Sequence, residues 1–315
     1  MRTTLRAMSG RQEPEPLRRL GRRAVLKQGT LLLAGSLLFR ESWLWAEEPQ
    51  ERPALRLGLV TDPHYADKPP AGNRYFRESL GKVAEAAKRL QADKPDLTVS
   101  LGDLVDSAAS LEAEKAALRR VVHELAALAG PHHYVLGNHC VENLTKPEFL
   151  AIVGQARSFD SFDAGGYHFV ILDSCFRSDG APYGRKNFRW GDAQVPPAER
   201  EWLRADLQQT PHKTIVLAHQ CLDLPAPMGV TNASQVREIL EESGKVLAVI
   251  QGHFHYGNYQ ELGDVHYCTL SAIVEGTGAK NNSYALLDLL PGDAIRITGF
   301  CKQKSYHWQP QPQPV

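Results

Sequence analysis

Short apolar runs alternate with amphipathic stretches from about residue 54 to residue 301, and this alternation limits the fold more than any other feature. Strand-like apolar runs occur at 55–61, 96–103, 133–139, 167–173, 213–219 and 245–253. Helical spacing of apolar residues occurs at 75–92, 109–129, 196–209 and 232–243. Strands that alternate with helices predict an α/β fold with a largely parallel sheet.

The C-terminal third follows a different pattern. Three strand-like runs, 265–274, 283–290 and 294–300, follow one another without helices between them. This predicts an antiparallel section or a second sheet. Because we find neither an internal repeat nor a break in composition, we expect residues 54–302 to form one domain.

Polar residues of a restricted kind follow five of the predicted strands. The candidate residues are Asp62 and His64, then Asp103, then Asn138 and His139, then His219, and finally His253 and His255. In an open α/β sheet such strand ends converge on one crevice. Carboxylate, amide oxygen and neutral imidazole are ligands of Mn, Fe, Zn and Ni, so the pattern predicts a metal site.

Each of these residues also has an ordinary explanation when taken alone. A Gly-Asp pair after a strand, as at Asp103, is typical of a turn or helix cap. His253 and His255, two apart, could share the exposed face of an edge strand, and His219 could be a hydrogen-bonded core histidine. The order and spacing of all five strand ends together favour the metal site.

The ordered set DxH, GD, GNH, a strand-end His and GHxH resembles the calcineurin-like metallophosphoesterase superfamily. The resemblance extends from Asp62 to His255 and implies two mixed β-sheets in a sandwich flanked by helices. It implies that Asp62, His64 and His255 hold one metal ion, that Asn138, His219 and His253 hold another, and that Asp103 bridges them. His139 is then the catalytic histidine that stabilises or protonates the leaving group.

The chemistry implied is hydrolysis of a phosphate ester or anhydride by two divalent metal ions, Mn or Fe, with Zn and Ni as alternatives. Such ions neutralise the phosphoryl oxygens and activate a water as hydroxide for in-line attack. The alternatives within this class are a monoesterase, a phosphodiesterase and a nucleotide diphosphatase. An alternative of another class is a non-catalytic metal-binding protein that retains the fold.

Two positions refine the resemblance. Purple acid phosphatases carry an iron-binding tyrosine three residues after the bridging aspartate, where this chain has Asp106. We therefore expect no tyrosinate-to-iron colour, and Asp106 either orients a metal ligand or is a solvated loop carboxylate. The run Arg74-Tyr75-Phe76-Arg77-Glu78-Ser79-Leu80 resembles the start of the manganese-dependent ADP-ribose/CDP-alcohol diphosphatase group, which carries glutamine in place of His64.

Three arginines are candidate contacts for an anionic substrate. Arg74 and Arg77 could bind a distal phosphate with two hydrogen bonds, and Arg185 could belong to a positive rim. Arginines at a solvated helix start or in a solvated loop are the alternative for each. With 36 basic and 36 acidic residues the chain has no formal net charge. A small phosphorylated substrate is therefore expected rather than a nucleic-acid polymer.

The chain ends are predicted to lie outside the domain. Residues 1–46 resemble an export signal of the twin-arginine type, with Arg22-Arg23 before the apolar stretch 29–39 and a candidate cut after Ala46. A generic signal peptide or an uncleaved anchor is the alternative, although the apolar stretch is short for a spanning helix. Residues 47–53 would be a linker and 303–315 a flexible tail. The predicted location is periplasmic or extracellular, with transient binding to the twin-arginine machinery and no stable membrane anchor.

Five cysteines, Cys140, Cys175, Cys221, Cys268 and Cys301, show no zinc-ribbon spacing. Cys140 and Cys221 lie close to predicted metal ligands in the sequence. They could form a disulfide in an oxidising compartment or be two unrelated thiols.

Overall fold

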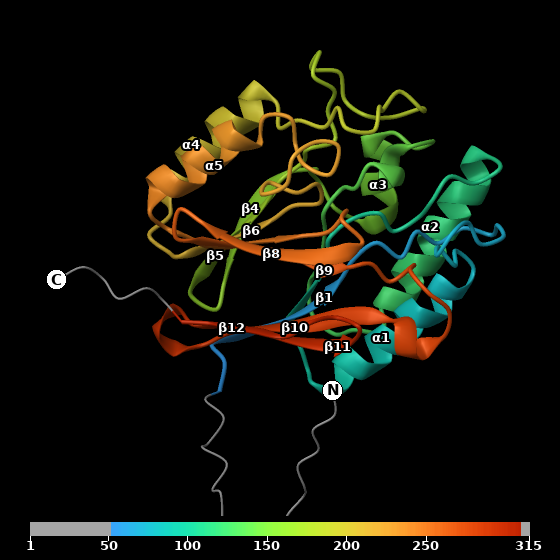
Figure 1. The fold of residues 1–315 in the computed structure, drawn as a ribbon, viewed down its shortest axis with the longest axis horizontal. Helices are drawn as coiled ribbons and strands as arrows, with labels where there is room; N and C mark the ends of the chain where they lie inside the picture. The colour runs from blue at the N-terminus through green and yellow to red at the C-terminus, as the bar shows by residue number, and fades with distance from the viewer. Residues whose placement is uncertain (1–51, 310–315) are drawn as a thin grey trace, which may run out of the picture. The chain divides into compact units, whose positions relative to one another are not determined.

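Two six-stranded β-sheets stacked face to face form the centre of this protein, whose computed structural model describes residues 52–309 (Figure 1). The first sheet has the order β12-β11-β10-β1-β2-β3. Its strands are β1 Leu55–Val60, β2 Leu97–Ser100, β3 His132–Tyr134, β10 Ser283–Leu289, β11 Ile295–Cys301 and β12 Tyr306–Trp308. The predicted sandwich of two mixed sheets is therefore confirmed.

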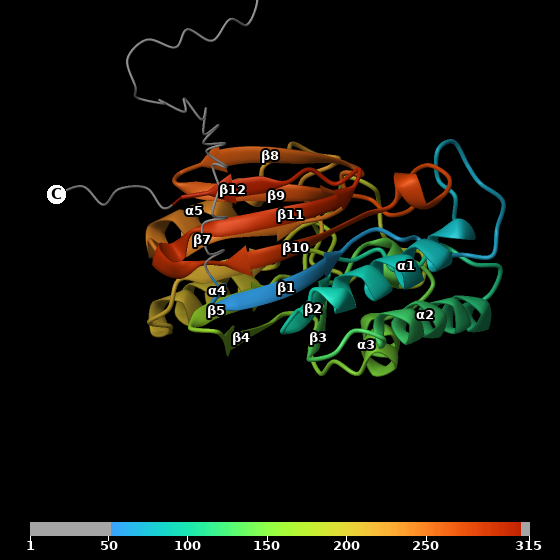
Figure 2. The same ribbon diagram turned by 90° about the horizontal axis from the view of Figure 1, so that it is seen from below.

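The second sheet has the order β4-β5-β6-β7-β9-β8. Its strands are β4 Asp160–Ala164, β5 Tyr167–Ile171, β6 Thr214–Leu217, β7 Val246–Gln251, β8 Tyr256–Leu262 and β9 Val265–Ser271. The first sheet is mixed, because β1, β2 and β3 run parallel while β10, β11 and β12 are antiparallel to their neighbours. The second is also mixed, because β5, β6, β7 and β9 run parallel while β4 and β8 are antiparallel to their neighbours. Figure 2 shows β1 beside β10, so strands from opposite ends of the domain are neighbours.

Five α-helices cover the outer faces of the sandwich within residues 52–309. They are α1 Glu78–Ala92, α2 Leu111–Leu125, α3 Lys146–Val153, α4 Pro197–Gln209 and α5 Ala233–Ser243. The first three pack on the first sheet and the last two on the second. None of the helices in this part of the chain is both long and apolar enough to cross a membrane.

Three apolar layers hold this arrangement together, and strand alternation produces them. In β6, Ile215 and Leu217 face the layer between the sheets, whereas Val216 faces the layer under α4 and α5. Leu57 and Leu59 of β1 likewise enter the middle layer, and Val60 packs under α1. Strands buried on both faces read as continuous apolar runs, which is why they are visible in the sequence.

Four elements differ from the prediction. Helix α3 was not expected, because it has only eight residues, although a capping box of Thr145 and Glu148 marks its start. Strands β4 and β8 lie at sheet edges and are rich in polar residues, so they lack an apolar run. The predicted flexible tail is wrong for residues 303–309, because β12 pairs with β11 and buries Trp308.

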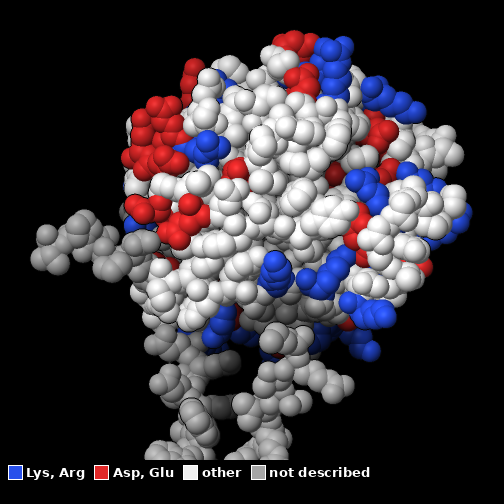
Figure 3. Space-filling view, in the orientation of Figure 1, with Lys and Arg blue, Asp and Glu red and all other residues white. Residues whose placement is uncertain are grey.

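The predicted export signal, and the linker up to residue 51, lie outside the described residues. On the face drawn in Figure 3, acidic side chains gather over the region of α4 and α5, and basic side chains are dispersed over the rest. This face carries no continuous basic surface.

Candidate metal centre

The predicted ligands come together where five strands end, and they come from both sheets. Three of these strands, β1, β2 and β3, belong to the first sheet, and β6 and β7 belong to the second. The convergence of the strand ends is therefore confirmed, and two sheets instead of one open sheet produce it. Two groups of ligand atoms result, each with its atoms within 4.8 Å of one another.

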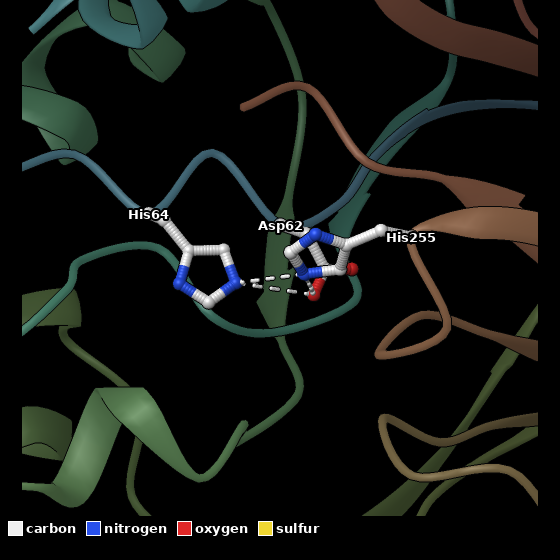
Figure 4. A group of neighbouring side chains, drawn as sticks. All are labelled: Asp62, His64 and His255. Carbon is white, nitrogen blue, oxygen red and sulfur yellow. Dashed lines mark hydrogen bonds and ion pairs between the residues drawn. The ribbon is translucent and has the colours of Figure 1, made fainter. Parts of the chain in front are cut away.

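The first group consists of Asp62, His64 and His255. In Figure 4 the Nε2 atoms of both imidazoles point at the carboxylate of Asp62. Each Nε2 lies 3.5 Å from Asp62 Oδ1, and the two nitrogens are 3.1 Å apart. All three side chains are buried.

The second group consists of Asp103, His219 and His253. Asp103 Oδ2 lies 3.1 Å from His219 Nε2, and His253 Nδ1 lies 3.3 Å from the same nitrogen. Asp103 Oδ2 also lies 3.4 Å from His64 Nε2 of the first group. This carboxylate therefore stands between the two groups, which is the place of a bridging ligand.

The donor atoms fit a pair of metal ions. Buried polar atoms normally have hydrogen-bond partners. Asp62 Oδ1 and both side-chain polar atoms of Asn138 have none among the described residues. In addition, the lone pairs of the facing Nε2 atoms of His64 and His255 would repel each other, unless a cation or a proton lies between them. Oxygen and imidazole nitrogen donors around such a position suit Mn, Fe or Zn.

Oxygen acceptors outside the two groups fix which nitrogen faces inward in three of the four histidines. His64 Nδ1 lies 3.1 Å from Asp106 Oδ2, and His255 Nδ1 lies 2.7 Å from Glu275 Oε1. His219 Nδ1 lies 2.7 Å from the carbonyl oxygen of Leu101. When Nδ1 donates to these acceptors, Nε2 carries the lone pair that a metal needs.

Asp106 is buried and contacts His64, so of its two predicted roles the structure shows the one that orients a ligand. A third group of possible ligand atoms, His64, Asp106 and His139, lies on the Nδ1 side of His64. There Lys68 Nζ lies 2.5 Å from Asp106 Oδ1 and already supplies positive charge. The positive charge of the Lys68 ammonium group disfavours a metal ion at that position.

The electrostatics of the centre favour positive charge. Burial lowers the pKa of His219, but the carboxylates of Asp103 and Asp62 outweigh it and raise this pKa to about 9. Burial also lowers the pKa of His255, and Asp62 and Glu275 raise it to about 8. For His253, burial and then His219 lower the pKa to about 3. A bound cation would satisfy the same carboxylates that otherwise attract protons.

The backbone at the site is held in conformations that side chains rarely adopt. Asp62, His64, Asp103 and His253 all have positive φ, between 44° and 68°. Such strain persists only where surrounding contacts enforce it, and it is common at functional sites. The positive φ angles direct these side chains inward from the strand ends.

The glycines beside the ligands are required by close approach. A Cβ on Gly137 would collide with the Asp103 carboxylate, and one on Gly252 would collide with Thr61 and Asp62. At the turn into the site the positive φ lies at His253, not at Gly252. Gly252 instead makes room for the Asp62 carboxylate, which accepts a hydrogen bond from His253 N at 3.0 Å.

His139 lies beside the metal ligands without belonging to either group. Its ring packs edge-on against His64, with centroids 4.7 Å apart, and against Phe188. Its Nδ1 is 3.1 Å from Glu142 Oε2, and its backbone N–H donates to Asp103 Oδ1. Burial lowers the pKa of His139, but Asp103 and Glu142 outweigh it and the pKa is raised.

Each of the three predicted substrate arginines has a protein partner. Arg74 lies 3.8 Å from Glu275, and Arg77 pairs with exposed Asp67. Arg185 pairs with Glu148 and donates to the carbonyl oxygen of Asn143. All five cysteines are free thiols in this structure, so no disulfide joins Cys140 to Cys221.

Sequence reasoning missed Glu275 and Glu142, which contact His255 and His139. Glu275 follows the apolar run that contains β9, and β9 is parallel to β7. It therefore occupies the edge of the sheet at which the other strands deliver ligands. Glu275 could have been found in the sequence if acidic residues had been considered after every apolar run and not only after the five predicted strands that carry candidate ligands.

Comparison with known proteins agrees with this geometry. The family model of the calcineurin-like phosphoesterases matches residues 55–257. A manganese-dependent ADP-ribose/CDP-alcohol diphosphatase of Arabidopsis thaliana is 24% identical over 277 residues, which cover 71% of this chain and 88% of the relative. A diphosphatase of the same description from Danio rerio is 24% identical, over 71% of this chain and 89% of the relative.

Solved structures show the same fold. A dimetal phosphatase from Danio rerio superposes with a TM-score of 0.72 at 21% identity, covering 82% of this chain and all of that one. A purple acid phosphatase from yellow lupin superposes with a TM-score of 0.54 at 13% identity, covering 81% of this chain and 54% of that one. Together with the family match over most of the domain, these findings show that the chain belongs to the calcineurin-like phosphoesterase family.

Proposed function

We propose that this metallophosphoesterase is a dinuclear enzyme that hydrolyses a nucleotide-type diphosphate and works with manganese. The observation that carries the dinuclear centre is the position of Asp103 Oδ2, 3.4 Å from a nitrogen of the first ligand group and 3.1 Å from one of the second. The substrate class and the metal are supported by the relatives, which are described as manganese-dependent ADP-ribose/CDP-alcohol diphosphatases.

In this proposal Asp62, His64 and His255 hold one ion, Asn138, His219 and His253 hold the other, and Asp103 bridges them. Two ions held there would neutralise phosphoryl oxygens and lower the pKa of the attacking water. Asp106 and Glu275 orient two of the imidazoles through Nδ1, so that Nε2 stays in place. A diphosphate places a second anionic group next to the reacting phosphorus.

His139 is the proposed proton donor to the leaving group. Glu142 holds its Nδ1, and its Nε2 has no protein partner among residues 52–309. That nitrogen is free to meet a substrate oxygen. A positioned general acid contributes about 10²–10⁴ in rate.

The test is hydrolysis by the purified protein with added manganese. ADP-ribose, CDP-glycerol, bis-p-nitrophenyl phosphate and p-nitrophenyl phosphate would be compared at equal concentration. We expect cleavage of the two diphosphates, with release of nucleoside monophosphate, and no cleavage after chelation of the metal. Cleavage of p-nitrophenyl phosphate alone would show a monoesterase and contradict the proposed substrate class.

We also propose export through the twin-arginine route, which rests on Arg22, Arg23 and the apolar stretch behind them. The test is fractionation of cells that express the full chain and a variant with both arginines changed to lysine. We expect the wild-type chain outside the cytoplasm and the variant inside. Equal distribution of the two chains would contradict this route.

A further inference from the structure

A cavity of about 370 Å³ lies directly beside the candidate metal centre. His255 belongs both to its lining and to the first ligand group. Asn73, Tyr75, Tyr256 and Lys302 line the same cavity. A substrate bound to the metal ions would therefore have this cavity next to it, on the side of His255.

The ammonium group of Lys302 uses only part of its hydrogen-bonding capacity. Its Nζ donates one hydrogen bond, 2.7 Å long, to the carbonyl oxygen of Glu275. The other two ammonium protons have no acceptor in the part of the chain that the structure describes. Lys82 provides a contrast, since its buried Nζ donates to the carbonyl oxygens of Ile273, Glu275 and Gly276.

No carboxylate within residues 52–309 forms an ion pair with Lys302. Glu275 is bound to His255 and paired with Arg74. Glu78, from α1, accepts hydrogen bonds from Thr277 and Gly278. Burial and then the positive charge of Lys82 lower the pKa of Lys302 to about 8, although Glu275 acts in the opposite direction. Among the residues that the structure describes, none therefore places a carboxylate in direct contact with the ammonium group of Lys302.

We propose that this cavity is a subsite for a second anionic group of the substrate, and that Lys302 is its specificity-determining residue. The ammonium group binds a phosphate or carboxylate carried by the part of the substrate beyond the reacting phosphorus. Polar side chains such as Asn73 complete the subsite. The effect of Lys302 on substrate specificity rests on the proposed function. The binding of an anion in this subsite does not depend on it.

The first experiment measures binding without catalysis. Lysine acetylation by acetic anhydride would be quantified by mass spectrometry, with and without inorganic phosphate, on manganese-loaded and on chelated protein. We expect phosphate to protect Lys302 in both preparations and to leave exposed Lys304 unprotected. Protection in the manganese-loaded protein alone would place the phosphate on the metal ions and overturn the subsite, as would equal acetylation with and without phosphate.

The second experiment compares substrates that differ in charge. ADP ends in a charged phosphate, whereas bis-p-nitrophenyl phosphate has two neutral arms. For Lys302→Met we expect KM for ADP to rise about tenfold or more, because a hydrogen bond between charged groups is lost, and KM for bis-p-nitrophenyl phosphate to stay the same. Lys302→Arg should restore the low KM, and Lys304→Met should match the wild type.

An equal rise in KM for both substrates would show that Lys302 has only a structural role, and no rise for ADP would overturn the proposal. If the protein hydrolyses neither these two substrates nor ADP-ribose and CDP-glycerol, the proposed function fails. The acetylation experiment still decides on the subsite in that case.

Discussion

The hydrogen bond between Asp106 and His64 gives a prediction that separates charge from shape. Asp106→Asn keeps the size of the side chain and an oxygen that can accept from His64 Nδ1, 3.1 Å away. It removes the negative charge that makes the imidazole a stronger donor to a metal. Removing such a partner typically weakens metal binding about 10–100-fold. This range corresponds to about 1.4–2.8 kcal/mol of metal-binding free energy.

The assay is competition between the protein and a chelator for manganese, read as metal bound per chain. Asp288→Asn is the matched control, because Asp288 is also a buried carboxylate but pairs with Arg56 and Arg296 in the first sheet. We expect weaker manganese binding in Asp106→Asn only. Equal affinity in Asp106→Asn and Asp288→Asn would refute the claim that Asp106 acts through His64.

Three further predictions concern separate features. His139→Ala should keep its metal content and lower kcat by about 10²–10⁴, whereas Asp103→Asn should lose metal; equal metal loss in both would contradict their different roles. Gly137→Ala should lose metal because its Cβ collides with Asp103, while Gly81→Ala, in open space on α1, should keep metal and gain up to about 1 kcal/mol in unfolding free energy. Burial raises the pKa of Asp288, but Arg56 and Arg296 outweigh this effect, so the pKa of Asp288 is lowered in the folded protein. The ionised Asp288 therefore stabilises the fold above its unfolded-state pKa, and this stabilisation is lost as the pH falls through its folded-state pKa. Thermal unfolding of Asp288→Asn should therefore depend less on acid pH than that of the wild type; parallel curves would speak against this pairing.

The buried strands and the long amphipathic helices could be predicted, because each produces a recognisable spacing of apolar residues in the sequence. β6 and β7 are continuous apolar runs because both of their faces are covered. β8 is a polar edge strand, and β12 has three residues, so neither has a periodicity to read. The pairing of β12 with β11 places Trp308 in the core, a contact that the surrounding Gln and Pro residues conceal.

The ligand residues could be predicted because each follows a strand that is visible in the sequence. Their division between two sheets could not, since it depends on how β1 and β10 pair across the length of the domain. The outer partners Asp106 and Glu275 depend on side-chain positions in three dimensions, and only Asp106 stood out by its spacing from Asp103. Lys302 lies in the turn after β11, far from any motif, so only the structure brings it near His255.

The most direct test of the account is the manganese content and the electron paramagnetic resonance spectrum of the loaded wild-type protein. A carboxylate shared by two ions, as proposed for Asp103, would couple their unpaired electrons. We predict two manganese ions per chain and the multiline spectrum of an exchange-coupled pair, which Asp103→Asn should abolish. A single ion per chain, or the spectrum of isolated ions in the wild type, would contradict the bridged dinuclear centre.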